Sequence, residues 1–190
     1  GRCDMVKHGK TWGYFCSQKV KMKKGVRTVM RQTGVLMPVS ALPSRTGVGE
    51  LGKDAYRWIQ ILKDSGVKIW QLLPLNPVGY GNSPYQPYSS CAGDELYISL
   101  ELLKEDGLLE EEVPSFREKE KRVDYEAVRA FKTPYLRKAV ENFLTQGRES
   151  QPEYQEFISQ KWVYEYGVYR ALKAANGGVC WNEWKLEEKN

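Results

Sequence analysis

Residues 67–75 (VKIWQLLPL) and 33–40 (TGVLMPVS) are two short apolar runs whose length suits strands that are buried on both faces. Between them, apolar residues recur at helical spacing and then meet the stop signal Ser65-Gly66, which predicts an amphipathic helix. The members of this apolar stripe are Leu51, Ala55, Trp58, Ile59 and Leu62. A strand, a helix and a strand joined by short connections predict a βαβ unit with parallel strands and a right-handed crossover. The sequence therefore predicts the start of an α/β fold.

The chain after this unit is expected to be mainly helical. A short strand is predicted at residues 96–100, followed by a brief helix. Asp124 is a good N-cap for a further helix, which we expect to kink or restart at Pro134. A last helix is predicted over residues 152–175, with Ile158, Trp162, Tyr169 and Leu172 facing inward.

A long loop leaves the second strand at its carboxyl end, the edge at which α/β folds place their sites. This loop, residues 76–93 (NPVGYGNSPYQPYSSCAG), has no helical period and is rich in turn formers. A sugar ring shows both C–H faces and a belt of hydroxyls, so it needs flat aromatic rings together with hydrogen-bonding groups. The loop offers that mixture in Tyr80, Tyr85, Tyr88, Asn82, Ser83 and Gln86, with Pro84 and Pro87 limiting the backbone. Composition alone supports this interpretation and the alternative, a stiff surface loop or a polyproline ligand for another domain, about equally.

Other motifs are weaker. Gly47, Gly49 and Gly52 match the G-x-G-x-x-G pattern of dinucleotide-binding proteins, but no acid stands at the end of the second strand. We therefore interpret these glycines as a tight entry into the helix. Asp94 and Glu95 are neighbours that point to opposite faces of an extended chain, so they are poor partners for acid and base roles.

Positive charge is concentrated near the N-terminal end. The formal net charge of +5 comes from 29 Lys and Arg against 24 Asp and Glu, yet residues 1–29 hold eight of the cations and one acid, Asp4. We expect this segment to be a basic extension outside the fold, and nucleic-acid binding through it is an open alternative.

His8 is the only histidine and the four cysteines form no Cys-x-x-Cys pair, so no metal site is predicted. No apolar run reaches the about 20 residues that cross a bilayer, so we expect no membrane partner and a cytoplasmic location.

Several of these stretches together resemble the N-terminal part of 4-α-glucanotransferases of the amylomaltase or disproportionating-enzyme type. The resemblance is most specific at residues 79–90 (GYGNSPYQPYSS) and continues at 162–173 (WVYEYGVYRALK) and 177–184 (GGVCWNEW). It implies a (β/α)₈ barrel with inserted helical subdomains and a retaining transfer of α-1,4-glucan segments between maltooligosaccharides, without a cofactor. It also implies that sugar is contacted by Ser83 and Tyr85 at the donor site, by Gln86, and by Tyr80 on an accessory stacking surface.

The family's catalytic carboxylates lie on later barrel strands, and no residue of this chain corresponds to them. We therefore expect an incomplete TIM barrel, with residues 30–110 as its start, including the 76–93 loop, and residues 111–190 as a helical inserted subdomain. The leading hypothesis is the N-terminal portion of a 4-α-glucanotransferase that binds glucan and is inactive alone, with a loosely packed or aggregating state in isolation. A stand-alone glucan-binding module is the second hypothesis and nucleic-acid binding is the third, while the sequence leaves the oligomeric state open.

Overall fold

The structure is a computed structural model that describes residues 3–8, 11–16, 32–116 and 122–185. The chain divides into two compact units, Gly1–Arg31 and Gln32–Asn190. Among the described residues, none of the helices has both the length and the apolar composition that a membrane span requires.

The first unit contains an antiparallel hairpin of β1 (Cys3–His8) and β2 (Thr11–Cys16), in which Cys3 lies opposite Cys16. This hairpin lies in the segment that we expected to be a basic extension, and β2 is rich in Trp, Tyr, Phe and Thr, the residue types that favour strands. Residues 17–29, which carry most of the lysines behind the nucleic-acid alternative, lie outside the described part of the chain.

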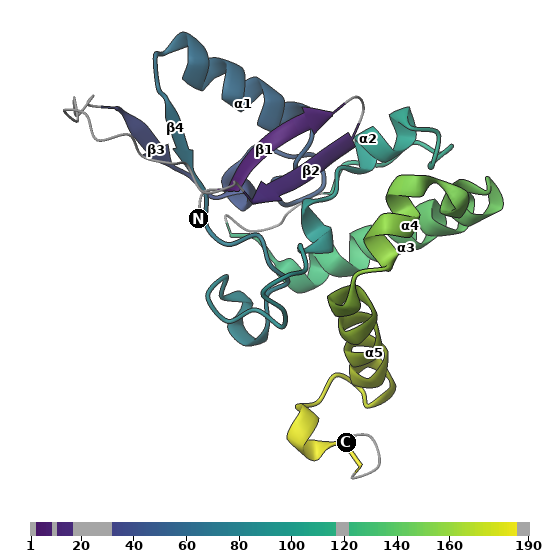
Figure 1. The fold of residues 1–190 in the computed structure, drawn as a ribbon. Coiled ribbons are helices and arrows are strands. Elements are labelled where there is room, and N and C mark those ends of the chain that lie inside the picture. The colour runs from purple at the N-terminus through teal and green to yellow at the C-terminus, as the bar shows by residue number, and fades with distance from the viewer. Residues whose placement is uncertain (1–2, 9–10, 17–31, 117–121, 186–190) are drawn as a thin grey trace, which may run out of the picture. The chain divides into compact units, whose positions relative to one another are not determined.

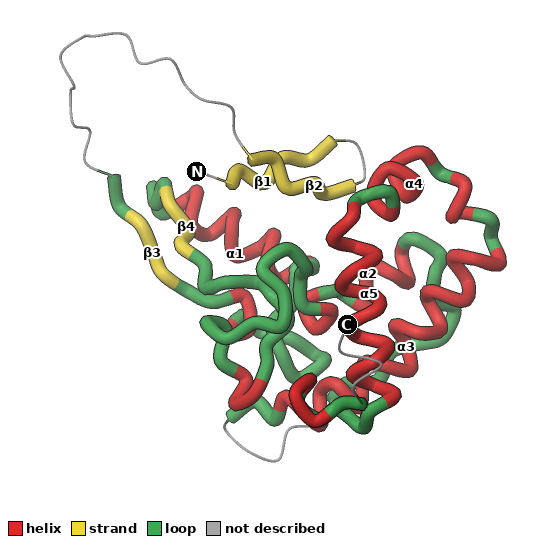
Figure 2. The backbone as a smooth tube through the Cα atoms, turned by 60° about the horizontal axis from the view of Figure 1, so that its bottom comes forward, coloured by secondary structure: helices red, strands yellow, loops and turns green. Residues whose placement is uncertain are grey.

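The second unit opens with the predicted strand, helix and strand. Strand β3 (Gly34–Leu36) pairs in parallel with β4 (Ile69–Gln71), and helix α1 (Lys53–Asp64) connects them, as Figures 1 and 2 show. The parallel βαβ unit is therefore confirmed. Both strands are shorter than predicted, because the prolines at 38 and 74 lack the amide hydrogen that would continue a ladder.

A small core joins α1 to the strand pair. Ala55 of α1 is buried with Val39 and Leu42 of the short 3-10 helix η1 (Val39–Ala41) and its flank. Trp58 and Trp70 meet edge to face at 6.5 Å, and Trp70 Nε1 donates to the Met37 carbonyl at 2.8 Å. The predicted stripe is right for Ala55 and Leu62, but Ile59 is exposed.

The predicted strand at 96–100 is wrong. The segment instead forms the 3-10 helix η3 (Glu95–Tyr97) and then enters helix α2 (Leu100–Glu105). Two side chains cause the change, because Asp94 accepts from the Leu96 amide and Ser99 accepts from the Leu102 amide as caps. Leu96 and Leu100 are buried while Ile98 between them is exposed, whereas one face of a strand would bury all three.

Helix α3 (Tyr125–Thr145) begins at the predicted N-cap, where Asp124 Oδ1 accepts from the Ala127 amide at 3.0 Å. The expected restart at Pro134 does not occur, because one helix runs through the proline. Val128 and Ala139, buried before and after Pro134, pack against different clusters and hold both halves of the helix in place.

The single helix predicted over 152–175 is in fact two, α4 (Pro152–Ile158) and α5 (Lys161–Ala175). The chain turns at Ser159, whose hydroxyl donates to the Glu156 carbonyl, and at Gln160, which has extended backbone angles. Trp162, Tyr169 and Leu172 are partly buried, while Ile158 is exposed, so the predicted inward face holds only within α5.

Further 3-10 helices are η2 (Tyr80–Asn82), η4 (Arg148–Ser150) and η5 (Trp181–Glu183). Figures 1 and 2 both show α3, α4 and α5 on the side of this unit away from β3.

Candidate saccharide-binding site

The 76–93 loop follows β4 and is closed at its base. The Asp94 amide donates to the Leu75 carbonyl at 2.8 Å, and Asn76 Nδ2 donates to the Ala92 carbonyl at 2.9 Å. The Val78 amide donates to Asp94 Oδ2 at 3.3 Å. We call these contacts the neck of the loop. Because both ends are held together, the loop is a compact Ω-type loop on the carboxyl side of a parallel strand.

Inside the loop, backbone hydrogen bonds fold the chain back on itself. The Gly79 amide donates to the Gln86 carbonyl at 3.1 Å, and the Tyr88 amide donates to the Pro77 carbonyl at 3.0 Å. The two sides approach so closely that a Cβ on Gly79 would lie 2.8 Å from the Gln86 carbonyl oxygen. A glycine is therefore required at this position, and the tip at 80–86 is set by the backbone itself.

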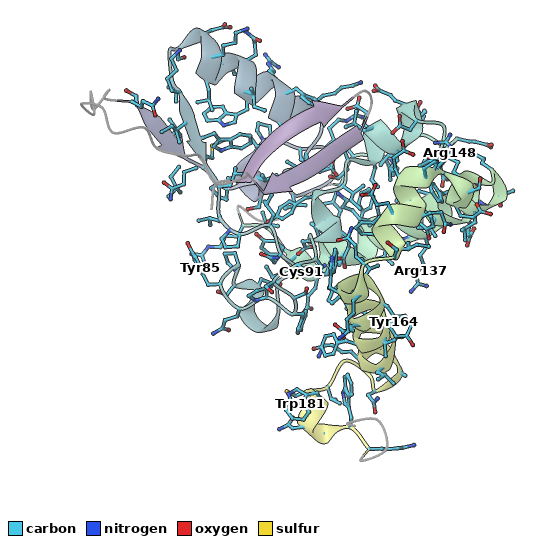
Figure 3. The ribbon with its side chains drawn as sticks, viewed as in Figure 1. Tyr85, Cys91, Arg137, Arg148, Tyr164 and Trp181 are labelled. Atoms are coloured by element: carbon cyan, nitrogen blue, oxygen red, sulfur yellow. The ribbon has the colours of Figure 1, made fainter. Side chains whose placement is uncertain are left out.

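The tip carries three of the four predicted sugar contacts in described positions. Tyr85 is 70% exposed and extends away from the ribbon in Figure 3. Ser83, half-buried, accepts from the Tyr85 amide through Oγ at 3.4 Å, and Gln86 is exposed. The backbone of Tyr80 starts η2, but its side chain lies outside what the structure describes. An open ring beside a hydroxyl and an amide is an arrangement that can hold a sugar.

Tyr88 differs from Tyr85. Its ring contacts Tyr169 of α5 at a centroid distance of 6.2 Å, and Lys173 Nζ lies over the ring at 5.0 Å. Tyr169 in turn meets Trp184 at 5.7 Å, and the buried Trp184 donates from Nε1 to the Val179 carbonyl at 3.2 Å. Tyr88 therefore anchors the loop to α5 through a cation–π and aromatic chain, and offers less free ring surface than Tyr85.

Charged residues of α3 and α5 hold the exit of the loop. Arg129 pairs with Asp94 at 2.9 Å and with Glu95 at 3.1 Å, and Arg170 pairs with Glu95 at 3.3 Å. Lys132, with no exposed surface, donates to the carbonyls of Leu96 and Ile98, both at 2.7 Å. The carboxylates of Asp94 and Glu95 are therefore both engaged in ion pairs.

Neither Arg129 nor Arg170 was predicted as part of the site, because both lie on helices far along the chain from the loop. The available signal was the spacing of Arg129 and Lys132, one turn apart on the face of α3 whose apolar members are buried. Burial lowers the pKa of the Lys132 ammonium group, and the Glu50 carboxylate opposes this effect.

A cavity of about 420 Å³ lies between the loop and helices α3 and α5. Gly79, Asn82 and Tyr88 line it from the loop, and Arg129, Arg170 and Lys173 line it from α3 and α5. Among the residues that the structure describes, no cluster of His, Cys, Asp or Glu has the arrangement of a metal site. The cavity and the tip thus combine aromatic, amide and charged groups, which can form hydrogen bonds with the hydroxyls of a ligand.

The G-x-G-x-x-G match has a packing role. A Cβ on Gly49 would lie 1.9 Å from the Val39 carbonyl oxygen, so only glycine fits where the chain passes η1. This contact agrees with the interpretation of the motif as a tight entry into α1.

A loop that leaves the carboxyl end of a parallel strand lies at the edge where α/β barrels and open α/β sheets form their active and binding sites. The sequence profile described as 4-alpha-glucanotransferase matches residues 37–190, and the chain belongs to this family. The resemblance stated from the sequence is thereby confirmed.

Individual relatives agree with the family profile. The chain is 39% identical over 159 residues to a 4-alpha-glucanotransferase of Thermus thermophilus, which covers 82% of this chain and 31% of the relative. It is 37% identical over 161 residues to the Synechocystis enzyme of the same name, with coverage of 81% and 32%. The amylomaltase of Streptococcus agalactiae, solved in complex with acarbose, superimposes with a TM-score of 0.76 at 33% identity, over 82% of this chain and 32% of that one. The chain thus spans about a third of the length of these relatives.

Proposed function

We propose that this chain is the N-terminal portion of a 4-α-glucanotransferase and that its 76–93 loop binds α-1,4-glucan. The observation that carries the proposal is Tyr85, an open ring at the tip of a loop whose neck is closed by hydrogen bonds. The amylomaltase that superimposes on this chain was captured with acarbose, which supports a saccharide ligand.

Glucan would bind by stacking and by hydrogen bonding. A glucose ring would lie on the face of Tyr85 and bury its C–H groups there, which contributes about 25 cal/mol for each Å² of apolar surface removed from water. The hydroxyl of Ser83 and the amide of Gln86 would bond to sugar hydroxyls, since each can both donate and accept. Tyr80 would add an accessory stacking surface. No cofactor is needed for this binding.

The proposed activity of the whole enzyme is a retaining transfer. A carboxylate attacks the anomeric carbon while a carboxylic acid protonates the leaving oxygen, which forms a glycosyl-enzyme and releases a shortened glucan. The second group, now a carboxylate, removes a proton from an acceptor hydroxyl, whose oxygen attacks the anomeric carbon and frees the nucleophile. We propose that neither carboxylate is in this chain, because the catalytic carboxylates of the family that it resembles lie on later barrel strands. The two acids beside the loop, Asp94 and Glu95, are held by Arg129.

The proposed architecture is the first βαβ unit of a (β/α)₈ barrel, with residues 111–190 as an inserted helical subdomain. Parallel strands are normally buried on both faces, yet Leu36 of β3 is 57% exposed and Ile69 of β4 is 42% exposed. Further strands beside β3 and β4 would cover these side chains. A cytoplasmic location is part of the same proposal.

Calorimetric titration with maltoheptaose tests the binding role. We expect heat of binding for the chain and about a fivefold to tenfold weaker affinity for Tyr85→Ala, as the loss of one stacked ring predicts. Tyr164→Ala is the matched control, because Tyr164 is a similarly open tyrosine, 74% exposed, on α5 (Figure 3). No heat at millimolar maltoheptaose, or equal losses in both variants, would contradict the proposal.

Incubation with maltotriose tests the proposed absence of catalytic carboxylates. We expect neither glucose nor longer oligomers from the chain alone. Time-dependent formation of both products, measured by chromatography, would show that the chain carries its own nucleophile and acid.

A further inference from the structure

One buried carboxylate ties the two ends of the 76–93 loop together. Oδ1 of Asp94 accepts from the Leu96 amide at 3.0 Å and from Arg129 Nη1 at 3.3 Å. Oδ2 accepts from the Val78 amide at 3.3 Å and from Arg129 Nη2 at 2.9 Å. Asp94, only 5% exposed, therefore joins the entry of the loop, its exit and helix α3.

Arg129 supplies the positive charge that this carboxylate needs. A carboxylate buried without a cation is costly, and a planar guanidinium can satisfy both of its oxygens at once. Arg129 also donates from Nη1 to Glu95 Oε1, which Arg170 of α5 reaches as well. The exit of the loop is thus fastened to two helices that lie distant in the sequence.

Lys132 holds a different part of the same segment. Its ammonium group binds the carbonyls of Leu96 and Ile98, which follow the neck. Arg129, one turn earlier on α3, is the residue that reaches the carboxylate of the neck itself. The two cations therefore have separable effects, with Arg129 acting on the loop and Lys132 on the path into α2.

We propose that Arg129 is a positioning residue for the saccharide site. By holding Asp94 it keeps the neck closed, so that Tyr85 is presented in one orientation before glucan arrives. This inference rests on the proposed function of the loop. A loop that is ordered in advance does not lose that entropy on binding, and affinity is higher as a result.

Amide hydrogen exchange of the full chain tests the positioning role without any ligand. In Arg129→Met we expect the amides of Gly79 and Tyr88 to exchange at least about tenfold faster, because a buried carboxylate loses its partner. The amides of α1 should keep their rates. Arg129→Lys should give an intermediate effect, since an ammonium group keeps the charge but not the planar fork. Arg137→Met is the matched control, an exposed arginine on the same helix (Figure 3).

Maltoheptaose titration of the same variants measures the consequence for binding. We expect Arg129→Met to weaken binding about tenfold, Arg129→Lys to weaken it less, and Arg137→Met to leave it unchanged. Unchanged exchange in the loop of Arg129→Met, or equal acceleration in the loop and in α1, would overturn the proposal. So would faster exchange in the loop with unaltered affinity. A wild-type chain that binds no maltoheptaose defeats the proposed function, whereas the exchange comparison still decides whether Arg129 fixes the loop.

Discussion

At the scale of single residues, Lys132 is a buried cation that serves three acceptors at once. Its Nζ lies 2.6 Å from Glu50 Oε1 and also binds two carbonyls. Replacement by methionine removes the donor of both carbonyls and leaves the Glu50 carboxylate with the Thr46 hydroxyl but no cation. We therefore expect Lys132→Met to lower the free energy of unfolding by about 3–5 kcal/mol. Urea denaturation measures this loss. Lys138→Met, which removes an exposed pair with Glu141 on the same helix, should cost less than about 1 kcal/mol, and a similar cost for both would refute the assignment.

Tyr97 makes stability depend on pH in the alkaline range. Burial raises the pKa of Tyr97 from 10.0 to about 12, with the nearby Tyr125 and Asp94 adding to the effect. A folded pKa above the unfolded value gives a stabilisation that is complete below pH 10 and is lost as pH rises toward about 12. For this half-buried ring we expect a loss of about 1–2 kcal/mol. Denaturation of wild type and Tyr97→Phe across this range measures it, and parallel curves up to pH 12 would contradict the expectation.

At the scale of an element, α3 tolerates a proline that should weaken it. Pro134 removes one helical hydrogen bond and is exposed, while the helix on both sides is held by burial of Val128 and Ala139. Pro134→Ala should therefore raise the free energy of unfolding by about 1–3 kcal/mol. Arg137→Ala, one turn later, should change it by less than about 0.5 kcal/mol. A loss of stability in Pro134→Ala would mean that the helix is bent around the proline for packing.

Elements with one clear local signal were predicted well, whereas an element with competing local signals and the contacts between distant residues were not. The parallel βαβ unit and the N-cap at Asp124 follow from short apolar runs and one side chain. The 3-10 helix at Glu95–Tyr97 was mistaken for a strand because its alternating apolar residues hid the capping role of Asp94. Distance along the sequence divides the site, since Tyr85 and Ser83 lie in one recognisable loop, whereas Arg129 reaches Asp94 across 35 positions of sequence.

At the scale of the whole chain, several large apolar side chains are exposed on α1, β3, α3 and α4. Examples are Leu36, Ile61, Val140 and Phe157, which are between 47% and 58% exposed. Exposed apolar surface promotes association, so the chain should self-associate with rising concentration. Ile61→Lys places a charge on α1 and should reduce association without lowering the melting temperature. Sedimentation velocity measures this, and a monodisperse monomer at high concentration in the wild type would contradict it.

The tip that carries Tyr85 belongs to a loop with no Asp, Glu, Lys, Arg or His from residue 76 to residue 93. A neutral sugar meeting an uncharged tip gains nothing from long-range steering, so dissolved ions have little to screen. The affinity of this loop for glucan should therefore be the same at low and at high salt concentration. Contacts between a basic segment and a polyanion weaken steeply as ionic strength increases. Affinity measured over a range of salt concentrations therefore distinguishes glucan binding by the loop from polyanion binding by the basic segment.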